Sequence, residues 1–263
     1  MLLLATIMEG GNPASFLNIP AFLIVAGGTS GATLASSDMS VLKGAIKLVQ
    51  RAIKGLALDF RGAAAQLVKL SEKARRQGLL ALESDLDQVE DAFAKKGLQL
   101  VIDGTESDLV IAILQSEMDS MQARHARNAK VFQTAGGFAP TLGIIGTVMS
   151  LVHVLENLSS PAGLGKSIAG AFLATLYGVG SANLMFLPIA NRLKDLSAQE
   201  MSYREMLLEG ILSIQAGDNP RMLGEKLETY VPPTERHAGA DVTELPTPST
   251  AAAVEPEPAA EAA

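Results

Sequence analysis

Threonine side chains in two uncharged stretches of the chain are the residues with the most distinctive chemistry. Thr147 lies in residues 131–155 and Thr175 in residues 167–191, and neither stretch contains Asp, Glu, Lys or Arg. Further polar side chains at membrane depth in these stretches include Ser150, Tyr177, Ser181 and Asn183. Hydroxyls in helices usually bond to a carbonyl one turn earlier and have no other role; we except Thr147 and Thr175. If these stretches move ions, the ionisable group must come from a partner.

Metal and nucleotide chemistry have little support in the sequence. The chain has no Cys, and its three His show no metal-ligand spacing such as H-E-x-x-H. Residues 161–167 read PAGLGKS, but the phosphate-loop motif requires Gly at the position of Ser160. We interpret this segment as an outer loop with Lys166 at the lipid interface. We expect no metal site, no cofactor and no enzyme; a nucleotide-driven enzyme is an alternative that rests on GKS alone.

Three segments are apolar enough to cross a membrane, which takes about 20 helical residues. Residues 131–155 and 167–191 reach this length, and residues 20–35 are marginal. The opening MLLLATIM is too short to span by itself, so we interpret it as the end of a truncated first span. Apolar residues make up 48% of the chain but aromatic residues only 4%, which is typical of small side chains packed between helices in lipid.

The predicted fold is an all-α integral membrane protein with a cytoplasmic helical domain between its second and third spans. The expected order is a remnant of the first transmembrane helix at 1–9, a periplasmic turn at 10–18, transmembrane helix 2 at 19–37, the cytoplasmic domain at 38–130, transmembrane helix 3 at 131–156, a periplasmic loop at 157–166, transmembrane helix 4 at 167–191, a cytoplasmic helical segment at 192–230 and a disordered acidic tail rich in Pro and Ala at 231–263.

Basic residues near the ends of the spans predict the orientation. They cluster on one side, at Lys43, Lys47, Arg51, Lys54, Arg124, Arg127, Lys130, Arg192 and Lys194. Loops rich in Lys and Arg stay in the cytoplasm. We therefore expect residues 38–130 and 192–263 on the cytoplasmic side of the membrane.

Apolar residues at helical spacing predict helices throughout the region before the third span. The expected helices cover residues 41–58 and 63–91, and a third begins at Thr105, with Thr105 and Asp108 placed as an N-cap box. This third helix has few breakers and can continue through Lys130 into the membrane. Useful alternation with a period of two is missing, so we expect no sheet.

A stripe of small residues marks one face of the last span. Its members recur every four residues and are Gly170, Ala174, Gly178 and Ala182. Small side chains allow helix backbones to approach closely in lipid. The contact can be with another helix of the same subunit or with a partner helix, and the sequence leaves both open.

Pro140 and Pro188 lie near the cytoplasmic ends of their predicted helices. Each removes a backbone hydrogen bond, which can produce a kink or hinge. Ordinary placement at a helix end is the alternative.

A dense run of both charge signs lies in the middle of the cytoplasmic region. It comprises Lys73, Arg75, Arg76, Glu83, Asp85 and Asp87. Such a run usually forms a solvated helix face, and binding of a partner is the alternative.

Several of these motifs resemble those of one family. APTLGIIGTVMSLVHVLENL at residues 139–158 and AGAFLATLYGVGSANLMFLPIANRLK at residues 169–194 closely resemble the MotA/PomA flagellar stator A subunit, within the MotA/TolQ/ExbB superfamily. AGGTSGAT at residues 26–33, the ALESD run after RRQGLL, VIDG at residues 101–104, and the pair Arg124 and His125 fit the same family. The resemblance extends from about residue 12 to residue 194.

The resemblance implies a flagellar motor protein of the bacterial inner membrane. Five such subunits would surround a dimer of a MotB-like B subunit, whose transmembrane helix carries the ion-binding aspartate. Inward flow of H⁺ or Na⁺, the transported ion and not a bound cofactor, would produce torque on the rotor protein FliG. Nucleic acid has no part in this function.

The resemblance also implies roles for particular residues. Thr175 and, more weakly, Thr147 look like hydroxyls that line the ion pathway. Pro140 and Pro188 look like the prolines that couple ion binding to conformational change. The charges that face the rotor look like Arg75 and Glu83. A TolQ/ExbB-like energiser of an envelope system is the alternative function, although span order and motifs there differ.

Overall fold

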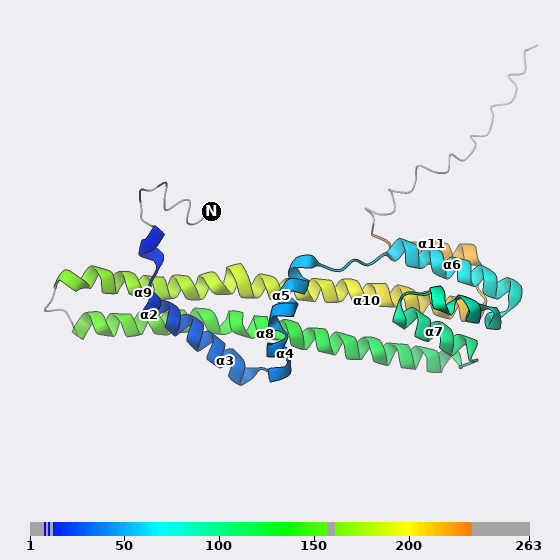
Figure 1. The fold of residues 1–263 in the computed structure, drawn as a ribbon, viewed down its shortest axis with the longest axis horizontal. Coiled ribbons are helices and arrows are strands. Elements are labelled where there is room, and N and C mark those ends of the chain that lie inside the picture. The colour runs from blue at the N-terminus through cyan, green and yellow to red at the C-terminus, as the bar shows by residue number, and fades with distance from the viewer. Residues whose placement is uncertain (1–7, 9, 11–12, 157–160, 233–263) are drawn as a thin grey trace, which may run out of the picture.

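The computed structural model describes residues 8, 10, 13–156 and 161–232, and within these ranges the chain forms helices and connecting segments without a strand (Figure 1). The all-α fold predicted from the sequence is thus confirmed. The predicted remnant of a first span at 1–9 lies almost entirely outside the described residues. The same holds for the predicted tail at 231–263.

Two long antiparallel helical segments form the axis of the molecule (Figure 1). One is α8, Ser107–Glu156, which has 50 residues and is therefore about 75 Å long. The other joins α9, Pro161–Ser181, a π-helical turn η4, Ala182–Phe186, and α10, Leu187–Ala216. Between α8 and α9 the sequence analysis expected an outer loop at 157–166. This was wrong for residues 161–166, because α9 begins at Pro161, a residue suited to a first helical turn.

The first apolar helix packs across this pair at one end. It consists of α2, Ile19–Phe22, a second π-helical turn η2, Leu23–Gly27, and α3, Gly28–Ser36. Asn18 starts it, because its side-chain oxygen accepts a hydrogen bond from the Ala21 N–H. Together with parts of α8 and of the α9–α10 segment, it makes three helices among the described residues that are long and apolar enough to cross a membrane.

Two short helices connect α3 to the rest of the chain. The single helix expected at 41–58 is wrong: α4, Met39–Lys43, and α5, Ala45–Lys54, are separated at Gly44. The chain leaves α5 at Gly55, where φ is +78°, a backbone conformation that suits glycine. An extended segment then leads to α6.

The helix expected at 63–91 is also interrupted. Asp59 caps α6, Phe60–Gln77, and Gly78 with φ of +87° ends it. A 3₁₀ segment η3, Leu79–Gln88, follows, and Asp91 caps α7, Ala92–Ile102. Helical periodicity of apolar residues persists through 3₁₀ turns, so the pattern alone did not reveal the break.

The start of α8 lies two residues beyond the predicted N-cap. The Val110 N–H donates to the Glu106 carbonyl, and the Thr105 N–H donates backwards to the Leu100 carbonyl. Thr105 thus belongs to the turn before the helix, and the predicted box with Asp108 was wrong. As predicted, α8 continues without interruption through Lys130 into the apolar stretch.

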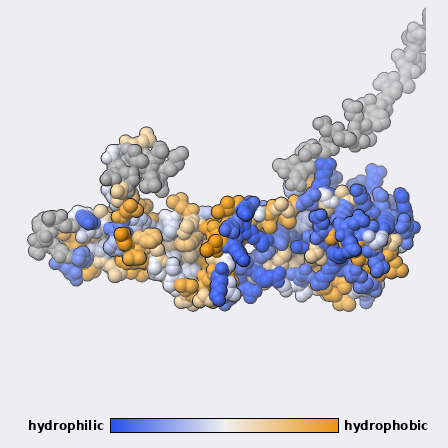
Figure 2. All heavy atoms as spheres, viewed as in Figure 1, coloured by the Kyte–Doolittle hydropathy of each residue, from blue (hydrophilic) through white to orange (hydrophobic). Residues whose placement is uncertain are grey.

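The polar end of the molecule, which we call the head, has its own core. It is formed by α6, η3, α7, the first part of α8, the last part of α10, and α11, Pro220–Glu228. Its most buried large side chains include Phe93, Leu98, Leu114, Met206, Ile211 and Leu227. Figure 2 shows hydrophilic atoms over this end and hydrophobic atoms over the end with the apolar helices. The exposed apolar side chains Ile144, Phe172 and Leu184 belong to the latter end, as expected of surfaces in lipid or against partners.

Candidate functional site

The two threonines singled out from the sequence are in direct contact. Thr147 Oγ1 on α8 lies 2.5 Å from Thr175 Oγ1 on α9. Thr147 Oγ1 also lies 3.0 Å from the Gly143 carbonyl oxygen, one turn earlier, and 3.0 Å from the Ala171 carbonyl oxygen on α9. Four oxygens thus meet between the two helices. Hydroxyl and carbonyl oxygens are the ligand type that hard cations and water prefer.

Close backbone contact between α8 and α9 makes this meeting possible. A Cβ atom added at Gly178 would lie 2.5 Å from the Ala139 carbonyl oxygen and 2.9 Å from Gly143 Cα. A Cβ atom added at Gly143 would lie 2.9 Å from the Ala174 carbonyl oxygen. Only glycine fits at these two positions, since the obstructing atoms belong to the backbone. The crossing therefore brings hydroxyls 28 residues apart in sequence within hydrogen-bond distance.

The small-residue stripe of the last span packs within the subunit. Ala174 and Ala182 are fully buried, and Gly178 faces Gly143. At Gly170, an added Cβ atom would lie 2.9 Å from the Asn18 amide nitrogen, beside the first span. Of the two alternatives left open by the sequence, the structure thus shows contact between helices of one chain.

Three other polar groups of the last span have hydrogen-bond partners. Ser181 donates to the Gly178 carbonyl and Asn183 to the Val179 carbonyl, both within the same helix. The Tyr177 hydroxyl instead bonds across to the Phe16 carbonyl and accepts from the Asn18 N–H. Tyr177 therefore ties the last span to the segment before the first one, a role that the sequence analysis did not identify.

Residues beside the two prolines are in contact between α8 and the last helical segment. Pro140 lies inside α8 and has no N–H to offer the Gly136 carbonyl one turn earlier. A Cβ atom added at Gly136 would lie 2.7 Å from Leu187 Cδ2, directly before Pro188. The residue before Pro188 therefore packs against α8 one turn before Pro140.

A π-helical turn precedes Pro188. In η4 the helix widens, and the Leu187 N–H donates to the Ala182 carbonyl five residues earlier. Such turns are rare and occur often at functional positions. The sequence pointed to Pro188 but not to this wider turn, which has no simple sequence signature.

The charged run in the head separates into paired and unpaired groups. Lys73 Nζ lies 2.7 Å from Asp85 Oδ2, and Lys95 Nζ lies 2.9 Å from Asp87 Oδ1. Among the described residues, by contrast, no ion pair within 4.0 Å involves Arg75 or Glu83, and both are exposed. The structure does not bring Arg75 and Glu83 into contact with each other. They stay available to a partner.

A cleft of about 490 Å³ lies beside Arg75. Its walls come from the end of α6, with Arg75 and Arg76, and from the start of α11, with Arg221. Because Arg221 is 146 positions further along the chain, the sequence alone gave no reason to group these three cations.

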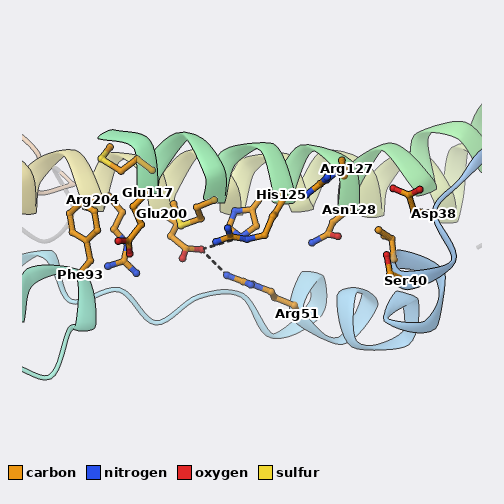
Figure 3. Close-up of a pocket in the computed structure, with 14 residues that line it drawn as sticks. Asp38, Ser40, Arg51, Phe93, Glu117, His125, Arg127, Asn128, Glu200 and Arg204 are labelled. Atoms are coloured by element: carbon orange, nitrogen blue, oxygen red, sulfur yellow. Dashed lines mark hydrogen bonds and ion pairs between the residues drawn. The ribbon is translucent and has the colours of Figure 1, made fainter. Parts of the chain in front are cut away.

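A crevice of about 660 Å³ lies between α5 and the α8–α10 pair, where the apolar helices meet the head (Figure 3). Arg51 Nη2 lies 2.7 Å from Glu200 Oε2, and His125 Nε2 lies 4.0 Å from the same oxygen. His125 Nδ1 is 3.1 Å from Ser197 Oγ. The sequence analysis noted His125 only as part of a family motif and missed Glu200. Neither has a spacing that reveals the contact.

Metal chemistry gains no support from the structure. Within residues 13–156 and 161–232, no three His, Cys, Asp or Glu side chains are grouped so that they could hold a metal ion. The GKS segment at 165–167 is part of α9 and follows no strand in the described chain.

The fold and the site together define a class of protein. It is an all-α membrane protein whose apolar helices meet at an oxygen-rich crossing and continue into a charged head.

Comparison with known proteins identifies the family. Residues 85–206 match the model of the MotA/TolQ/ExbB proton channel family. Motility protein A of Borreliella burgdorferi is 45% identical over 170 residues, which cover 65% of each chain. Chemotaxis protein PomA of Vibrio alginolyticus is 35% identical over 84% of this chain and 87% of its own. The flagellar MotAB stator complex from Bacillus subtilis contains a chain with a TM-score of 0.82 and 33% identity, covering 91% of this chain and 96% of that one.

The chain belongs to the MotA/TolQ/ExbB proton channel family. The resemblance to MotA/PomA subunits seen in the sequence is confirmed. Family members are channel and motor components and not enzymes, which confirms that part of the prediction as well.

Proposed function

We propose that this chain is the A subunit of a flagellar stator in the bacterial inner membrane. With a MotB-like B subunit, it couples inward flow of H⁺ or Na⁺ to torque on the rotor protein FliG. Five copies surround a dimer of the B subunit, and the head and the C-terminal segment lie in the cytoplasm. The relatives named motility protein A and PomA and the MotAB stator structure support this proposal, and the clustered basic residues beside the spans support the orientation.

One observation carries the proposal. The crossing of α8 and α9 supplies hydroxyl and carbonyl oxygens at Thr147 and Thr175, yet residues 131–155 and 167–191 contain no Asp, Glu, Lys or Arg. Ionisable groups within a membrane are costly and usually mark the ion site. A subunit that offers oxygens but no carboxylate is suited to a partner that brings the acid.

The prolines and the head complete the proposed mechanism. Binding of the ion at the partner's aspartate changes the contact on α8 and α9, and the interrupted helices at Pro140 and Pro188 bend in response. The bend moves the head, where the unpaired charges of Arg75 and Glu83 contact the rotor. Exposed charges act over roughly 8–10 Å at physiological ionic strength, which suits a contact that forms and breaks repeatedly.

The identity of the partner tests the first part of the proposal. The tagged chain is extracted from membranes in mild detergent, and co-purifying proteins are identified by mass spectrometry. We expect a protein with one transmembrane helix, an aspartate in that helix and a peptidoglycan-binding domain. A partner with a periplasmic domain for an envelope receptor would instead establish the TolQ/ExbB-like alternative. The dependence of swimming speed on external Na⁺ at fixed pH then distinguishes the two coupling ions.

Rotation of tethered cells tests the contact with the rotor. Arg75→Glu is expected to reduce torque strongly while the protein still reaches the membrane. Arg61→Glu is the matched control, because Arg61 is exposed on the same helix but lies near its opposite end. Equal torque in the two variants would exclude the role assigned to Arg75.

A further inference from the structure

We propose that the ion pair between Arg51 and Glu200, beside His125, is a latch. It fixes α5 to the α8–α10 pair, so that movement at the turn before Pro188 reaches the head in a defined direction. Its link to torque rests on the proposed stator function, whereas the latch itself is a property of this chain.

First, α5 is a short helix with a glycine directly before it and another directly after it. It starts after Gly44 and ends at Gly55, where φ is +78°, and an extended segment follows. Ile46 and Ile53 on its outer side are 75% and 78% exposed. With flexible residues at both ends, the position of α5 depends on contacts made by the helix itself.

Second, the apolar contacts of α5 reach the segment around Pro188. A small cluster joins Ala52 of α5 to Phe132 of α8 and Leu193 of α10, and Phe186 and Ile189 pack against it. These last two residues flank the Leu187–Pro188 pair. A change of helix direction at Pro188 must therefore either break these contacts with α5 or move α5 together with α10.

Third, the polar contact of α5 lies further along α10, on the side of the head. Glu200 follows Pro188 by 12 residues, about 18 Å along a helix. Its side chain is only 14% exposed, and it receives Arg51 at 2.7 Å (Figure 3). The Arg51 side chain is 40% exposed, so water is excluded mainly on the side of the carboxylate. Removal of Arg51 leaves a largely buried carboxylate, which is costly.

Fourth, the neighbours of Glu200 favour this pairing over others. The pKa of His125 is lowered, mainly by burial and further by the Arg51 and Arg124 guanidinium groups, although Glu200 opposes this. A neutral imidazole leaves the carboxylate to Arg51. The charged groups that line the rest of the crevice are Asp38, Glu117, Arg127 and Arg204, from the segment before α4, from α8 and from α10. Arg204 is held by Asp91 at 2.8 Å, and Glu117 by Lys96 at 2.6 Å.

Distance measurements on the full-length chain test the latch directly. The chain has no Cys, so Gln50→Cys on α5 and Gln199→Cys on α10, both exposed, allow two nitroxide labels without background. In lipid nanodiscs, pulsed electron paramagnetic resonance is expected to give one narrow distribution of the distance between the two labels. Arg51→Glu and Glu200→Arg should each broaden it, and the double charge swap should restore it.

Lys47→Glu provides the matched control. Lys47 lies one turn before Arg51 on α5, is exposed and makes no ion pair with other described residues, so this variant should keep the narrow distribution. An unchanged distribution in both single variants, or a swap that fails to restore it, would overturn the latch.

Torque in tethered cells then tests the link to function. The single variants are expected to lose torque and the swap to recover most of it. Broadened distances with normal torque would overturn the coupling role of the latch. Failure of the unmodified chain to drive rotation would instead refute the stator proposal, and the distance test would still decide the latch.

Discussion

Thr147 on α8 and Thr175 on α9 share a hydroxyl contact of 2.5 Å beside the close approach of the two helix backbones at Gly143 and Gly178. The contact depends on Gly143 and Gly178, because any side chain there would collide with backbone atoms. Oxygens from both helices are therefore held at a position set by packing. The hydroxyls and the glycines form one unit, and the predictions below test its parts.

Removal of the hydroxyls should impair ion movement more than stability. Thr175→Val keeps the shape of the side chain but removes an oxygen, at a cost of about 1 kcal/mol for one hydrogen bond. We expect much slower swimming and reduced ion uptake at normal protein levels. Thr175→Ser retains the oxygen and serves as control. If valine and serine variants swim equally well, the hydroxyl has no part in ion movement.

A larger residue at the crossing should separate α8 from α9. In Gly178→Val the new side chain meets the Ala139 carbonyl, and overpacking of this kind costs about 1–3 kcal/mol. The expected result is a lower unfolding temperature in detergent and loss of function. Gly180→Ala is the control, because a Cβ added at Gly180 would have no heavy atom within 4 Å apart from its own helix backbone. Equal unfolding temperatures for the two variants would contradict the close crossing.

Restoring a backbone donor at position 188 should stiffen the last helix. Pro188→Ala supplies an N–H for the Leu184 carbonyl and favours a regular helix over the wider η4 turn. We expect unchanged or slightly higher thermal stability together with a loss of torque. Hydrogen exchange of the amides at 182–188 measures the stiffening. Normal torque with slower exchange would show that bending at Pro188 is not needed.

Acidification should destabilise the structure through His125. An unfolded His takes up a proton near pH 6.5, whereas burial lowers the pKa of His125 in the folded chain. The unfolded state then binds more protons, so the contribution to stability is complete above about pH 6.5 and decreases as the pH falls towards the lower, folded pKa. His125→Gln should have a shallower pH dependence of unfolding than the unmodified chain. Identical profiles between about pH 5 and pH 8 would mean that His125 is not the responsible group.

Predictions about single helices were correct where a helical pattern continued over many residues. They were wrong where a short interruption divided the helix. The helix through Lys130 was visible because apolar residues continue without a breaker into the membrane stretch. By contrast, the breaks at Gly44 and Gly78 were missed, since one glycine in a periodic segment is compatible with a continuous helix. The crossing at Gly178 was half predicted: the stripe of small residues was evident, but not which helix it meets.

The sequence by itself determined that the chain is a helical membrane protein of the MotA/PomA type, with hydroxyls and prolines but no carboxylate in residues 131–155 and 167–191. The composition of a stretch and the order of residues in a motif can be read from the sequence without knowing how the chain folds. Only the tertiary structure decided which distant groups meet. Thr147 contacts Thr175 across 28 residues, and Arg51 contacts Glu200 across 149. Such pairs depend on how helices cross and where they bend, and these features are set by packing of many side chains at once.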